Sequence, residues 1–177
     1  MNILLTILII IAAVVVLFLI AAALIKKEYT VQQQVIIDKN SRDVFNYIKL
    51  LKNQKNFNKW AMMDPDAKMD YIGTDGTVGF IYTWDSENKN VGKGEQEIKS
   101  ISGNARIDSV VRFEKPFKNV AEVFMETRAV SEKQTSVQWA MNGKNPYPMN
   151  IMNLIIPGML SKDMGTSLNN LKNILES

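Results

Sequence analysis

The chain has 177 residues, of which 46% are hydrophobic and 22% charged, with a net charge of +3 at pH 7. A small net charge of mixed sign gives no support for nucleic-acid binding, which concentrates basic residues on one face. Cysteine and histidine are both absent, which excludes disulfides, Cys/His zinc sites, Ser-His-Asp triads and histidine acid–base chemistry. We expect neither a metal nor a cofactor.

An uncharged stretch begins the chain. Residues 3–25 are apolar apart from Thr6, and as a helix they would extend roughly 34 Å, enough to cross a bilayer core. We predict a single-pass transmembrane anchor over residues 1–27. The alternative is a cleaved signal peptide, which would require a charged start and a shorter apolar core. Lys26 and Lys27 follow the apolar span, so the positive-inside rule places the domain at residues 28–177 on the cytoplasmic side of the cell membrane.

The domain begins with a predicted strand over residues 28–39 and a short helix capped by Asn40 or Ser41. Four lysines then follow at spacings that would place them on one face of a continuous helix: Lys49, Lys52, Lys55 and Lys59. A solvated helix face is the favoured interpretation. Contact with anionic headgroups is the alternative, because the linker to the anchor is short.

Six further strands are predicted from alternating apolar and polar residues. They cover residues 69–72, 78–84, 95–101, 106–113, 121–128 and 136–142. Strands with one wet face are typical of antiparallel sheets. The clearest of the six has a large, mostly aromatic set that should face the interior: Val78, Phe80, Tyr82 and Trp84.

A long amphipathic helix is predicted to end the chain, over Met159–Leu175. Its apolar positions recur at helical spacing: Leu160, Met164, Leu168, Leu171 and Leu175. A short apolar segment, Met149–Ile156, precedes it, and Pro157-Gly158 should break or kink the chain between the two. Strands followed by a helix indicate an α+β layer structure.

Short motifs occur along residues 28–175 in an order that carries a family resemblance. They are Glu28-Tyr29-Thr30-Val31, Asp43-Val44-Phe45, Trp60 with Asp64-Pro65, Val78-Gly79 with Tyr82-Thr83-Trp84, Val91-Gly92-Lys93-Gly94-Glu95, Arg106-Ile107, Lys115-Pro116-Phe117, Asn145-Pro146 and the closing helix. In this order they resemble the START/polyketide cyclase-like (SRPBCC) superfamily, in its membrane-anchored polyketide cyclase-like branch. The resemblance implies a helix-grip fold, in which a curved antiparallel sheet of about seven strands holds the C-terminal helix with an apolar cavity between them. It does not imply cyclase activity.

The favoured function is a membrane-tethered module that binds a hydrophobic small molecule or lipid in this cavity. Candidate lining residues come from the strands, the first helical region and the end of the chain, where methionines could form an adaptable lid. They are Trp60, Phe80, Tyr82, Trp84, Ile98, Phe113, Met125, Trp139, Met152, Met159 and Met164. For each of these residues, simple core filling is the alternative.

Two other functions remain open. An enzyme of the polyketide cyclase type would have to use Tyr82, Asp108 or Glu95 for acid–base chemistry, although Asp108 and Glu95 fall on faces predicted to point outward. A membrane-tethered protein-interaction module would need an exposed apolar patch. Phe124, on an otherwise charged face, is a weak hint of one, but we expect it to pack under the loop at Pro116-Phe117.

Overall fold

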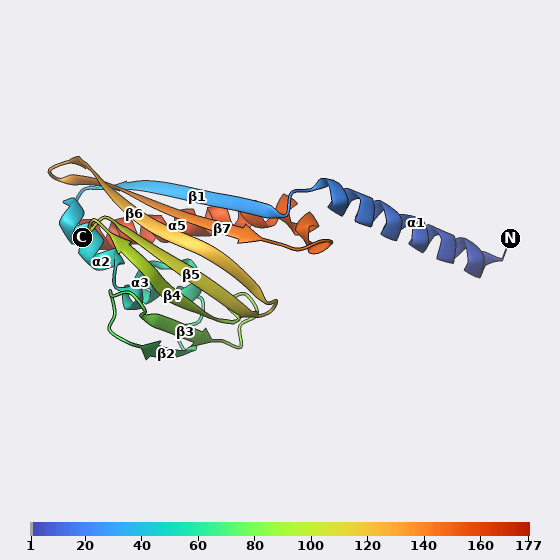
Figure 1. Ribbon diagram of the computed structural model, residues 1–177, viewed down its shortest axis with the longest axis horizontal. Helices are drawn as coiled ribbons and strands as arrows, with labels where there is room; N and C mark the ends of the chain where they lie inside the picture. Colours follow the sequence, from blue (N-terminus) through green and yellow to red (C-terminus); the bar gives the residue numbers. More distant parts are fainter. Residues whose placement is uncertain (1) are drawn as a thin grey trace.

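An apolar helix, α1 (Ile3–Leu24), begins the computed structural model, which describes residues 2–177. The helix projects away from the rest of the chain (Figure 1), and Ala22 is its buried residue. Its length and composition suffice to cross a membrane. The apolar helix expected from the sequence is therefore present.

Seven antiparallel strands form one curved sheet in the order β1-β7-β6-β5-β4-β3-β2. The strands are β1 (Glu28–Ile37), β2 (Lys68–Ile72), β3 (Ile81–Asp85), β4 (Lys93–Ser102), β5 (Arg106–Lys115), β6 (Asn119–Ser131) and β7 (Gln134–Lys144). Inward residues of β4 to β7 alternate with charged or polar outward residues. This alternation gives the sheet one apolar face that must be covered.

Two sets of helices cover that face. The C-terminal helix α5 (Ile156–Glu176) packs along β1, and the short helices α3 (Gln54–Phe57) and α4 (Lys59–Met62) lie against α5 (Figure 1). The remaining helical segments are α2 (Ser41–Ile48), η1 (Leu51–Asn53) and η2 (Met149–Leu154). The α+β helix-grip prediction is confirmed.

The core joins α5 to the sheet. Met164, Leu168 and Leu171 are fully buried beside inward strand residues such as Val137. Polar contacts fix α5 along β1: the Gln33 side chain donates to the Ser161 hydroxyl at 2.7 Å. The helical stripe expected from the sequence is thus the stripe that the sheet buries.

The last helix begins earlier than the sequence predicts. Pro157 and Gly158 lie in its first turn and do not interrupt it. Proline is compatible with this position because the first backbone N–H groups of a helix have no intrahelical partner. The predicted break at Pro157-Gly158 is therefore wrong.

Strand β3 begins later than predicted. Gly79 has a φ of +87°, a conformation outside the strand region, and Val78 is 61% exposed. The regular strand begins only at Ile81, so Val78 does not belong to the inward set.

The four lysines at residues 49–59 do not share a helix face. Their stretch is divided among the end of α2, η1, α3 and α4. Lys59 instead forms an ion pair with Asp163 of α5, and the Lys52 ammonium lies 4.7 Å from the centre of the Tyr71 ring.

We expect Leu171→Ala to lower the free energy of unfolding by about 2–5 kcal/mol, because Leu171 is fully buried between α5 and the sheet. Asn173→Ala, on the exposed side of the same helix, should change it by less than about 0.5 kcal/mol. Urea denaturation of the full chain in detergent micelles measures both. An equal decrease in the free energy of unfolding in the two variants would contradict the placement of α5.

Candidate functional site

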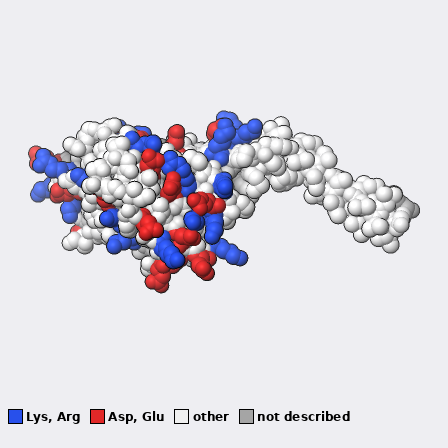
Figure 2. Space-filling model, turned by 60° about the horizontal axis from the view of Figure 1, so that its bottom comes forward, with Lys and Arg blue, Asp and Glu red and all other residues white. Residues whose placement is uncertain are grey.

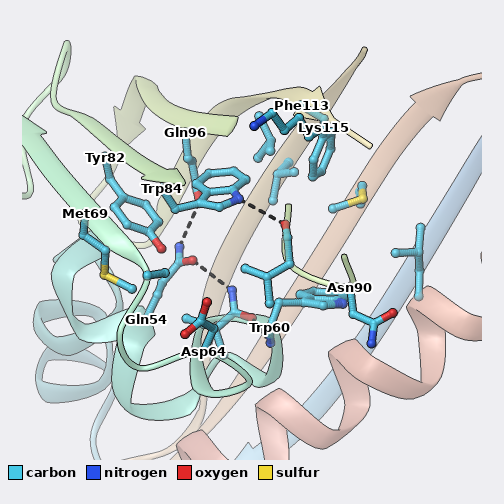
Figure 3. Close-up of a pocket in the computed structure, with 18 of the residues that line it drawn as sticks. Gln54, Trp60, Asp64, Met69, Tyr82, Trp84, Asn90, Gln96, Phe113 and Lys115 are labelled. Atoms are coloured by element: carbon cyan, nitrogen blue, oxygen red, sulfur yellow. Dashed lines mark hydrogen bonds between the residues drawn. The ribbon is translucent and has the colours of Figure 1, made fainter. Parts of the chain in front are cut away.

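A cavity of about 260 Å³ lies between the concave face of the sheet and the short helices α3 and α4 (Figure 3). Strands β3 to β7 form one wall, and α3, α4 and the loop after them form the other. Its lining residues are Gln54, Asn58, Trp60, Ala61, Asp64, Ala67, Met69, Tyr82, Trp84, Asn90, Val91, Gln96, Val111, Phe113, Lys115, Pro116, Val123, Trp139, Met141 and Leu160. All three tryptophans of the chain are in this set.

Trp84 forms the centre of the aromatic wall, and Gly94 makes room for it. The two residues face each other across β3 and β4. A Cβ atom on Gly94 would lie 2.6 Å from the Trp84 ring and 2.5 Å from the carbonyl oxygen of Arg112. The Trp84 indole N–H donates to the carbonyl of Val91 at 3.3 Å, and its ring meets Phe113 edge-on with 6.2 Å between ring centroids. Glycine at position 94 therefore fixes where the indole lies.

A second pair of aromatic rings joins the two walls of the cavity. Trp60 of α4 and Trp139 of β7 meet edge-on with 6.2 Å between ring centroids. The Trp139 indole N–H is buried and has no hydrogen-bond partner among residues 2–177. An unpaired buried donor is unfavourable, and because this nitrogen is closed off from the cavity as well as from solvent, a ligand in the cavity does not reach it.

Three amides form a polar line across the mainly apolar lining. The Gln54 side chain donates to Gln96 at 3.1 Å, and its carbonyl oxygen accepts from Asn58 at 3.1 Å (Figure 3). Gln54 and Gln96 are both buried. Because each amide orients the next, the line presents fixed donors and acceptors to the cavity.

Asp64 brings a carboxylate to the same cavity, where it accepts a hydrogen bond from the Ser86 hydroxyl. Sequence reasoning did not select Asp64, Gln54, Asn58 or Gln96. Two features of the sequence could have indicated these polar residues. Gln96 is a polar residue on the same strand face as Ile98, and Gln54 and Asn58 are four residues apart, the spacing of neighbours on one helix face.

Tyr82 is the one candidate acid–base residue that lines the cavity. Burial, with a smaller contribution from Tyr71, raises the pKa of Tyr82 to about 12. The phenol is therefore neutral at physiological pH, so it can donate a hydrogen bond or a proton but does not act as a base.

Glu95 and Asp108 lie on the outer face of the sheet, as expected. The Arg112 guanidinium pairs with Glu95 at 2.8 Å, and the Arg106 guanidinium pairs with Asp108 at 2.7 Å. The hydrogen bond from Arg106 holds the pKa of Asp108 below its ordinary value.

Phe124 lies on the same outer face, where the Arg106 guanidinium is 3.7 Å from the centre of its ring. The expectation that Phe124 packs under the loop at Pro116-Phe117 is therefore wrong.

The structure brings together five of the eleven residues selected from the sequence. Those that line the cavity are Trp60, Tyr82, Trp84, Phe113 and Trp139. Four others are buried in the core beside it: Phe80, Ile98, Met125 and Met164. The last two lie exposed on the surface: Met152 and Met159.

The placement of the cavity explains these differences. The sequence predicted a cavity bounded by the sheet and the C-terminal helix, but the cavity is bounded by the sheet and by α3, α4 and the loop after them. Leu160 is consequently the residue by which α5 reaches the cavity. The expected methionine lid is replaced by Trp60, Ala61 and the loop to Ala67.

Comparisons with known proteins detect similarity in structure only. No protein-family model and no curated protein matches the sequence. Among solved structures, norcoclaurine synthase from Thalictrum flavum, in complex with dopamine and hydroxybenzaldehyde, has a TM-score of 0.64 at 9% identity, covering 83% of this chain and 86% of that chain. The Aha1 dimer from Colwellia psychrerythraea has a TM-score of 0.58 at 13% identity, covering 84% and 96%. Ara h 8.0201 has a TM-score of 0.57 at 10% identity, covering 84% and 97%.

These neighbours define the class of domain. The part of the chain that follows α1 has the Bet v1-like helix-grip fold. Identities this low show the shared fold and nothing about the reaction or ligand.

We expect wild type to lose stability relative to Tyr82→Phe as pH rises from about 10 to about 12. The raised pKa means that unfolded Tyr82 ionises first, so its stabilising contribution is complete below about pH 10 and is lost as pH approaches 12. The difference in unfolding free energy between the two proteins should change by about 2 kcal/mol over this range. Denaturation at several pH values measures it. A difference that does not vary with pH would contradict the burial of the phenol.

Proposed function

We propose that this protein is a membrane-tethered binding module that holds a hydrophobic small molecule in the cavity of its helix-grip domain. The observation that carries the proposal is the cavity of about 260 Å³ walled by all three tryptophans. Closed cores leave few voids larger than a water molecule, so a space of this size and lining is suited to a ligand.

The volume of the cavity limits the size of the ligand. An engineered apolar cavity of about 150 Å³ accepts benzene, and drug-sized ligands occupy pockets of about 300–1,000 Å³. A molecule with one or two rings, or a short acyl chain, fits between these limits. The norcoclaurine synthase structure, with its bound dopamine and hydroxybenzaldehyde, supports single-ring molecules as a reasonable class.

The polar atoms of the lining indicate the chemistry of the ligand. The neutral phenol of Tyr82 would donate to an acceptor such as a carbonyl oxygen. The amides of Gln54 and Gln96 would orient a second polar group. The ligand is thus an apolar body that carries at least one hydrogen-bond acceptor.

The tether is the α1 helix, which crosses the cell membrane once. Lys26 and Lys27, directly after the helix, favour a domain on the cytoplasmic side. Together with the helix-grip domain, this arrangement supports the membrane-anchored polyketide cyclase-like branch of the SRPBCC superfamily, with an anchor at residues 1–27 and a binding domain at residues 28–177.

An enzyme of the polyketide cyclase type is the second candidate. Tyr82 favours it, because a neutral buried phenol in a cavity can protonate a carbonyl oxygen. Glu95 and Asp108 do not take part, since both are held in ion pairs on the outer face of the sheet. Binding without chemistry requires fewer groups and is the function we favour.

Quenching of tryptophan fluorescence tests the binding proposal, because every tryptophan of the chain lines the cavity. The probe is 6-bromo-2-naphthol, a two-ring molecule with one hydroxyl group, whose bromine quenches an indole at contact. With the full chain in lipid nanodiscs, wild type should show saturable quenching. Val111→Phe, which places a ring inside the cavity, should weaken binding at least about tenfold.

Val120→Phe is the matched control, because it makes the same change on an exposed position of β6. It should bind the probe as wild type does. Quenching that does not saturate, or that is equal in all three proteins, would show that the probe reports only on the bilayer and would overturn the proposal.

A further inference from the structure

The segment between β7 and α5 carries no charge. Residues 145–161 contain no Asp, Glu, Lys or Arg, and lysines lie at both ends, at positions 144 and 162. The segment includes η2 and the first turn of α5. It takes no part in the cavity except through Leu160.

This segment is fastened to the end of α1. The buried Asn150 side chain donates to the carbonyl oxygens of Ala22 at 2.6 Å and Ile25 at 2.7 Å. Asn153 donates to the carbonyls of Lys26 and Lys27, both at 2.9 Å. The last carbonyls of a helix lack full intrahelical pairing, and Asn150 donates to two of them, while Asn153 binds the two residues that follow the helix cap. The domain is therefore held against α1 by fixed contacts rather than by a free linker.

The contacts with α1 set the depth of the segment in a membrane. The 22 residues of α1 span about 33 Å, close to the thickness of a hydrocarbon core of about 30 Å. Leu24 then lies at the boundary with the headgroups, and Leu19 lies about 7.5 Å deeper. The Tyr147 hydroxyl donates to the carbonyl of Leu19 at 3.4 Å, so the start of the segment is level with the last turns of α1. Interfacial segments bury their apolar faces to a similar depth, about 5–10 Å.

The side of the segment that faces away from the core is apolar. Leu154 is 70% exposed, Ile155 57% and Met159 61%. Exposed lysines at positions 26 and 27 border it, and Figure 2 shows an uncharged α1 with basic side chains gathered where it meets the domain. Apolar side chains beside basic ones fit a bilayer with anionic headgroups.

We infer that residues 147–159 form an interfacial surface that lies in the same bilayer that α1 crosses. This inference rests on the membrane tether proposed above. Leu154, Ile155 and Met159 contact the acyl chains near the headgroups, while Asn150 and Asn153 hold the surface at that level. Leu160, the next residue, lines the cavity, so the surface ends beside the site.

Site-directed labelling tests the inference, because the chain has no cysteine and each introduced thiol is unique. Leu154→Cys and Ile155→Cys carry an environment-sensitive nitrobenzoxadiazole label. Val14→Cys, in the middle of α1, reports on the tether. Val130→Cys, an exposed position in β6 at the end of the domain far from α1, is the matched control (Figure 1). The full chain is placed in nanodiscs of phosphatidylcholine and phosphatidylglycerol with a nitroxide on the acyl chain, near the headgroup or near the chain end.

Labels at positions 154 and 155 should shift to the blue and lose most of their emission to the shallow nitroxide. The label at position 14 should be quenched by the deep nitroxide, and the label at position 130 by neither. If position 14 is quenched while positions 154 and 155 behave like position 130, the interfacial surface is wrong and the tether stands. A blue shift at 154 and 155 without quenching would indicate a protein contact and would also overturn the inference. Absence of quenching at position 14 would overturn the tether and the inference together.

Discussion

The structure depends on how the concave, apolar face of the sheet is covered. A seven-stranded sheet with alternating inward residues cannot leave that face in water. The apolar stripe of α5 covers it along β1, and α2 covers it over β6 and β7. Between them, α3 reaches β4 through Gln54 and Gln96, and α4 reaches β7 through Trp60 and Trp139. The cavity lies between the strands and the short helices α3 and α4. The site therefore results from the way the helical segments cover the sheet.

The cavity differs from the surrounding core in the residues that bound it. Core positions such as Met164 and Val137 are fully buried by close packing. The cavity is instead bounded by large rings held apart by fixed contacts: Trp84 by Gly94 and Val91, and Trp60 by Trp139. Rigid rings cannot collapse into the space as flexible side chains would. The Gln54 amide donates to Gln96 and accepts from Asn58, which allows polar groups to line an apolar space.

Much of the fold could be predicted from the sequence. Strands appear as alternating apolar and polar residues and helices as apolar residues three or four positions apart, and both patterns are local. The stripe on α5, the succession of strands along the chain and a helix cap at Asn40 or Ser41 all follow from such patterns, and Asn40 is the residue that caps the helix. The site was predicted only in part. Inward strand positions gave Tyr82, Trp84, Phe113 and Trp139, but no local pattern distinguishes a residue beside a void from one in a filled core. Residues 51–62 form three short helical segments, too short for a clear period, so their insertion between α5 and the sheet, with Gln54 and Asn58, was not foreseen.

The central claim is that the space between the sheet and α3–α4 is open to an apolar guest, and xenon tests it most directly. Xenon enters dry apolar cavities, and methyl resonances beside it shift. In methyl-labelled full-length protein under xenon pressure, Val111, Val123 and Met141, which line the cavity, should shift with saturation. Val137 and Met164, buried in the filled core, should not. Equal small shifts at all five methyl groups would contradict the account.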